Sequence, residues 1–85
     1  MVENYEKFNS IEDLYKHLLP AINTKLNELR RMKLYNITNL DIWNYCVKNK
    51  WHNKKDLQIY EMVNDILNID ELNIEMFVKK NGRNL

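Results

Sequence analysis

Apolar residues recur at helical spacing along most of the chain. In the first third, steps of three and four put a run of leucines and isoleucines on one helix face. Pro20 falls inside this run, and a proline removes a backbone hydrogen bond and clashes with the preceding turn. Such a proline either kinks a helix or begins a new one, and we favour a short helix near residues 10–18 followed by a longer one near 20–34. The run consists of Leu14, Leu18, Ile22, Leu26 and Leu29.

Four helix starts are indicated by a short polar residue followed three positions later by an acid. Such a residue accepts hydrogen bonds from the free amides of the first turn, and the acid can bond back to the cap. We therefore predict helices from Thr38 to about Lys48, from Asn53 to about Leu67 and from about Asp70 to Lys80, with Gly82 as the last C-cap. The pairs are Ser10 with Asp13, Thr38 with Asp41, Asn53 with Asp56, and Asn68 with Glu71.

Each of these later helices has an apolar face that predicts its buried side. The sets are Leu40, Trp43 and Val47 with Cys46 beside them; Leu57, Tyr60, Val63, Ile66 and Leu67; and Leu72, Met76 and Phe77. Alternating strand patterns and hairpin dipeptides are missing from the sequence.

The resulting fold class is all-α, a small single-domain bundle of four to five helices. A chain of 85 residues, 45% of them hydrophobic, has the size and composition of one globular domain. We expect a flexible N-terminus over residues 1–9, a helical domain over 10–81 and a C-terminal tail over 82–85.

The sequence argues against membrane insertion and against most enzyme classes. No apolar run approaches the roughly 20 residues that span a bilayer, and the single cysteine, Cys46, cannot form an internal disulfide. A lone glycine, Gly82, excludes phosphate-cradling loops, and His17 and His52 have no partner at metal-ligand spacing. We predict a cytoplasmic protein without catalytic residues, metal or cofactor, and nothing in the sequence indicates a homodimer.

The charges are unevenly distributed even though the net charge is only +1. Residues 30–55 contain seven bases and one acid. Lys48 and Lys50 suit the negative end of a helix, whereas Lys54 and Lys55 fall in a predicted first turn, where cations are disfavoured. Together with the bases that end the long helix, they form a candidate site for phosphates. Its residues are Arg30, Arg31, Lys33, Lys48, Lys50, Lys54 and Lys55, with Trp51 among them.

Trp51 follows the predicted end of its helix and has two interpretations. It either folds back onto the core, which we favour because small domains use large aromatics to complete their cores, or stays exposed and stacks on an unpaired base. Residues 56–75 contain six acids and no base. Their face is a candidate surface for a partner helix. The residues proposed for it are Asp56, Glu61, Asp65, Asp70 and Glu71.

Three fragments, in this order, resemble the ComN family of post-transcriptional regulators of Gram-positive bacteria. They are LLPAINTKLNEL (18–29), YNITNLDIWNYCVKNKW (35–51) and LQIYEMVNDIL (57–67), and the resemblance spans roughly residues 14–77. Its most specific parts are the Thr-x-x-Asp-Ile-Trp helix start, the Lys-x-Lys-Trp turn and Val-Asn-Asp-Ile.

The resemblance implies a small helical cytoplasmic protein that acts on messenger RNA for late competence, and that associates with a scaffold protein of the division site and cell poles. Three functions are consistent with the sequence. The first is a regulator that contacts RNA through the basic residues, and the second is an adaptor that binds a partner protein without nucleic acid. The third is a helix-turn-helix DNA-binding protein, which is disfavoured because NLDIWNYCVK has few side chains that read bases.

Overall fold

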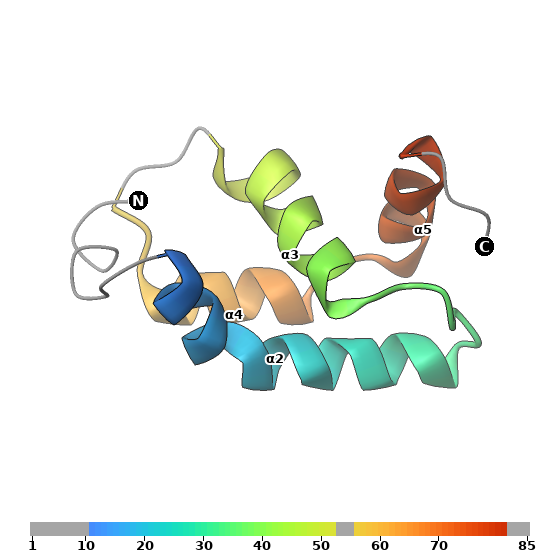
Figure 1. Ribbon diagram of the computed structural model, residues 1–85, viewed down its shortest axis with the longest axis horizontal. Helices are drawn as coiled ribbons and strands as arrows, with labels where there is room; N and C mark the ends of the chain where they lie inside the picture. Colours follow the sequence, from blue (N-terminus) through green and yellow to red (C-terminus); the bar gives the residue numbers. More distant parts are fainter. Residues whose placement is uncertain (1–10, 53–55, 82–85) are drawn as a thin grey trace.

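The structure is a computed structural model that describes residues 11–52 and 56–81. These residues form four α-helices and one π-helical turn that continues the second helix (Figure 1). No strand occurs within the described ranges, so the predicted all-α class is confirmed. The elements are α2 (Ile11–Arg31), α3 (Asn39–Cys46), the π turn η1 (Val47–Trp51), α4 (Ile59–Leu67) and α5 (Glu71–Lys80).

The prediction of two helices separated at Pro20 is wrong, because α2 runs without a break from Ile11 to Arg31. Its apolar stripe is buried on both sides of the proline, from Leu14 to Leu29. Packing of this whole stripe offsets the roughly 3 kcal/mol that an interior proline costs. In Figure 1 the first turns of α2 are tilted away from the axis of the rest, as expected for a proline kink. Thr24 Oγ1 donates to Pro20 O at 2.9 Å.

α2 is the central element, since both α3 and α4 pack against it, while α5 packs against α3. Lys25 lies on the α4 side of α2 and is only 3% exposed. Its Nζ donates to the carbonyl of Leu67 at 3.3 Å and to Glu28 Oε1 at 3.4 Å. A cation therefore satisfies a carbonyl at the negative C-terminal end of α4 and ties the two helices together.

The predicted start of α3 is confirmed in detail. Thr38 Oγ1 accepts from Asp41 N at 3.2 Å, and Asp41 Oδ2 accepts from Thr38 N at 2.8 Å, which completes the capping box. The predicted apolar face is correct at Cys46 and in part at Trp43, but wrong at Leu40 and Val47, which are 59% and 37% exposed. Because α3 packs against α2, α4 and α5, it buries a different face. That face is made by Ile42, Tyr45 and Cys46, with Trp43 partly buried beside it.

The helix predicted from Asn53 to about Leu67 begins later than expected within the described residues. α4 begins at Ile59, and its cap is Gln58, whose backbone amide donates to Glu61 Oε1 at 2.8 Å. Asp56 has a φ of 58°, a left-handed conformation that a helix cannot continue through. The apolar stripe of this helix is correct at Leu57 and Ile66, with Val63 partly buried, but Tyr60 and Leu67 are exposed.

α5 begins where predicted, but its cap is Asp70, which accepts from the amides of Leu72 and Asn73 at 3.1 Å. Asn68 instead ends α4. The predicted face is wrong at Leu72 and Met76, which are 59% and 58% exposed. Burial falls on Ile74 and Val78, with Phe77 partly buried. Ser10, Asn53 and Gly82, to which other capping predictions referred, lie outside the described residues.

The π turn η1 brings Trp51 into the core. In an α-helix, five residues advance about 500°, so Trp51 would face well away from Cys46. In a π turn the hydrogen bonds join residues five positions apart, so Trp51 comes nearly above Cys46. Trp51 is 5% exposed, its Nε1 donates to Asp65 Oδ2 at 2.8 Å, and its ring packs edge-on against Trp43 at a centroid distance of 5.7 Å. The packing interpretation of Trp51 is therefore confirmed.

The Trp51–Asp65 hydrogen bond should contribute measurably to stability. Trp51→Phe and Asp65→Ala should each lower the free energy of unfolding by about 1–3 kcal/mol, because each leaves a partly buried group without its partner. The double variant should lose less than the sum of the two, by about 1 kcal/mol, as measured by urea unfolding.

Asn64→Ala, an exposed position on the same helix, is the matched control and should unfold like the parent chain. Strictly additive losses in the double variant would show that the two side chains do not stabilise each other.

Candidate nucleic-acid interface

The C-terminal end of α2 is closed by a Schellman motif. Leu34 N donates to Leu29 O at 3.0 Å, and Lys33 N donates to Arg30 O at 2.9 Å, the two bonds that define the motif. Leu34 is partly buried and packs against the hydrophobic core, to which Leu29 belongs. The residue between the helix and Leu34 must adopt a left-handed conformation, and Lys33 does so with a φ of 70°. A non-glycine residue there is strained by about 1 kcal/mol.

Three cations surround this helix end. Arg30 and Arg31 occupy the last turn of α2 and Lys33 follows them, and all three are exposed. None of their side chains forms an ion pair with another described residue. Their position is favoured by the partial negative charge of the helix terminus, and their charges remain available to a phosphate group.

Tyr35 adds an aromatic ring to the same end and was missing from the sequence-based site. It lies in the connection between α2 and α3 and is 66% exposed. A large aromatic residue in a polar connection, two positions after a basic cluster, was the signal that could have identified it.

The other predicted cations lie elsewhere. Lys48 and Lys50 belong to η1, which follows α3 in yellow-green in Figure 1, toward the opposite end of the molecule from the C-terminus of α2. Lys54 and Lys55 lie outside the described residues. The prediction that both basic clusters form one patch is therefore wrong for the residues that the structure describes. Because Trp51 is buried, its ring is also unavailable for stacking on a base.

Three of the five acids predicted for partner binding have structural contacts. Glu61 and Asp70 cap the starts of α4 and α5, and Asp65 accepts the hydrogen bond of Trp51. Asp56 and Glu71 are exposed. Helix capping therefore explains part of the acidic stretch, because carboxylates accept hydrogen bonds from the backbone amides at helix N-termini.

Cys46 and its neighbour Tyr45 are poor candidates for chemistry. Burial raises the pKa of the Cys46 thiol to about 12, against a smaller lowering by Lys50 and a further small rise from Asp65. The thiol therefore stays protonated at neutral pH and is a weak nucleophile. Burial also raises the pKa of Tyr45, helped by Cys46 and Asp70. Within the described residues, no three metal-ligating side chains come together.

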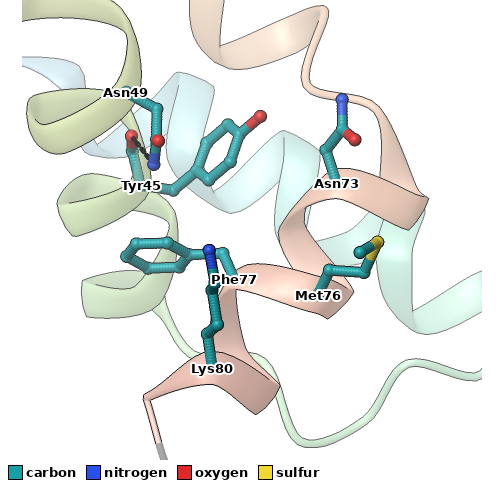
Figure 2. A pocket seen from close by; sticks show the side chains of 6 residues that line it. All are labelled: Tyr45, Asn49, Asn73, Met76, Phe77 and Lys80. Carbon is teal, nitrogen blue, oxygen red and sulfur yellow. Dashed lines mark hydrogen bonds between the residues drawn. The ribbon is translucent and has the colours of Figure 1, made fainter.

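A depression of about 330 Å³ separates α5 from α3 and η1. Figure 2 shows the Tyr45 ring and the Lys80 side chain reaching into the space between the helices, and Asn49 turned back to Tyr45 O, to which it donates at 3.2 Å. Tyr45 and Phe77 pack edge-on at 5.4 Å between centroids. The lining is completed by Asn73 and Met76.

A second depression, of about 310 Å³, lies between α5 and the loop that follows α2. It is lined by Lys33, Leu34, Tyr35, Asn36 and Glu75. It therefore adjoins the basic end of α2 and adds a carboxylate to it. No helix in the described ranges is both long and apolar enough to cross a membrane.

These features define a small all-helical domain with an exposed basic helix end. The family described as "Post-transcriptional regulator" matches residues 11–80, and the chain belongs to this family. Post-transcriptional regulator ComN of Bacillus subtilis (strain 168) is 36% identical over 58 residues, 67% of this chain, and the chain spans 59% of that relative's length. No solved structure matches the chain.

The strain at Lys33 should be measurable. Lys33→Gly should raise the free energy of unfolding by about 1 kcal/mol, because glycine adopts a positive φ without the clash of a Cβ atom. Lys33→Ala removes the same charge but keeps the clash, so it should leave stability nearly unchanged. Urea unfolding of the parent chain and the two variants measures the difference in free energy of unfolding. Equal stability of the glycine and alanine variants would contradict the assignment of backbone strain to position 33.

Proposed function

We propose that this protein regulates messenger RNA after transcription, without catalysis, by binding unpaired RNA directly at the C-terminal end of α2. The observation that carries the proposal is the group of three exposed cations, Arg30, Arg31 and Lys33, that have no ion-pair partner among the described residues. Membership of the post-transcriptional regulator family supports the class of activity.

The chemistry of the helix end favours a single strand over a duplex. Phosphates of either would be attracted to the cations, but the exposed ring of Tyr35 suits a base whose face is free. The preceding Schellman motif holds Lys33 and Leu34 by backbone hydrogen bonds, so the ring and the charges are presented together. The resemblance to the ComN family points to late-competence transcripts as targets, and to action in the cytoplasm.

Salt dependence of binding tests this proposal. If the three cations each contact one phosphate of a single strand, log affinity should fall against log salt with a slope of about −2. Fluorescence anisotropy of a labelled uridine-rich RNA measures it. Arg30→Ala with Arg31→Ala should reduce affinity and flatten the slope by about 1 or more.

The matched control removes two cations from the other end, with Lys48→Ala and Lys50→Ala, and should change binding less. Equal losses of affinity in the two double variants would show that the binding site is not at the C-terminal end of α2. Undetectable binding at low salt would exclude direct RNA contact. A duplex competitor that displaces the protein better than a single strand would instead favour the DNA-binding alternative.

A second candidate function is that of an adaptor, favoured by the exposed face of α5. Leu72 and Met76 are separated by one helical turn and are each more than half exposed. Met76 also lines the depression that contains Tyr45 and Phe77. The scaffold protein of division site and poles that the resemblance implies is the partner we propose for this face.

Fluorescence microscopy tests the adaptor function. The labelled protein should gather at division sites and poles, and Leu72→Lys with Met76→Lys should make it diffuse, because two charges would be buried in the contact. Tyr60→Lys changes an equally exposed apolar position on α4 and should leave the location unchanged. Polar localisation of the α5 variant would contradict a role for this face.

A further inference from the structure

The depression between α5 and the loop after α2 has the lining of a nucleobase pocket. It combines the aromatic ring of Tyr35, the cation of Lys33 and the carboxylate of Glu75, in a volume of about 310 Å³. That volume lies at the lower end of the roughly 300–1,000 Å³ of small-molecule sites. Lys33 and Glu75 do not form an ion pair with each other, and neither side chain bonds to another described residue.

We propose that this depression binds one unpaired guanine of the RNA, with Tyr35 stacked on the base and Glu75 accepting hydrogen bonds from its Watson–Crick edge. The inference rests on the proposed RNA-binding function and deepens it from phosphate contact to base selection. Arg30, Arg31 and Lys33 would hold the phosphates beside the base.

The carboxylate determines which base fits. An ionised carboxylate only accepts hydrogen bonds, through two oxygens that can take two parallel donors. Guanine offers two adjacent donors, the N1–H and the 2-amino group. Adenine and cytosine set a ring nitrogen acceptor beside their amino group, which the carboxylate repels, and uracil has one donor between two carbonyls. Glu75 therefore discriminates in favour of guanine.

Tyr35 and Lys33 carry the sequence-independent part of the contact. Stacking on an aromatic ring accepts any base, because every base has a π face. Lys33 lies between the phosphates and the base, and its charge offsets the repulsion between Glu75 and the RNA backbone. The strained conformation of Lys33 fixes the direction in which the chain enters the Tyr35 loop.

Anisotropy with four short labelled RNAs tests the pocket. Each is a uridine-rich strand with one central guanosine, adenosine, inosine or uridine. The parent chain should bind the guanosine strand about tenfold more tightly than the adenosine or uridine strands. Inosine lacks the 2-amino group, so its strand should bind with intermediate affinity.

Variants separate the two roles within the pocket. Glu75→Gln should abolish the preference for guanosine while keeping affinity for the uridine strand. Tyr35→Ala should weaken all four strands about tenfold, and Tyr35→Phe should restore binding. The control is Tyr60→Ala, since Tyr60 is 67% exposed and Tyr35 66% exposed, and it should bind like the parent chain.

The outcomes distinguish the two proposals. Salt-dependent binding that needs Arg30 and Arg31 but shows no preference for guanosine overturns the pocket and keeps the proposed function. Loss of all RNA binding at low salt overturns both. A guanosine preference that survives Glu75→Gln, with circular dichroism showing the variant folded, also overturns the assignment of Glu75.

Discussion

The structure depends on one continuous apolar stripe along α2. Its five members, spaced by three or four residues, are buried on both sides of Pro20, and α3 and α4 both pack against the helix. Burying a leucine or isoleucine side chain contributes about 1.5–3 kcal/mol, so the stripe outweighs the hydrogen bond that the proline removes. A break at residue 20 would separate the two halves of the surface on which the rest of the core is built. The stripe comprises Leu14, Leu18, Ile22, Leu26 and Leu29.

Polar contacts then fix how the other helices sit on this stripe. Lys25, buried beside α4, bonds to the carbonyl of Leu67 at the end of that helix. Two residues earlier on α4, Asp65 accepts a hydrogen bond from Trp51, whose ring packs edge-on against Trp43. Both contacts bury a polar group with its partner, so each favours one arrangement over others that would leave it unsatisfied. The π turn is the backbone adjustment that lets Trp51 reach this position.

The same geometry separates the basic residues into two groups. Arg30, Arg31 and Lys33 are held at the end of α2 by the Schellman motif, whereas Lys48 and Lys50 lie on η1 toward the other end of the molecule. Of the three cations at the α2 end, Lys33 lines a depression together with Tyr35 and Glu75. In the site that we propose, phosphate attraction, stacking and hydrogen-bond selection act together at this end of the domain. Lys48 and Lys50 lie too far along the molecule to belong to the same site.

Local patterns in the chain were enough to predict the all-α class, the buried stripe of α2 and the capping box of Thr38, because each depends on residues within a few positions of one another. They also identified Arg30, Arg31 and Lys33 as candidates for phosphate contact. The buried faces of α3 and α5 depend instead on how the helices pack together, since the apolar residues of each helix exceed what one face can hold. The burial of Trp51 and the meeting of Tyr35 with Glu75 likewise depend on contacts between distant segments, which local spacing does not encode.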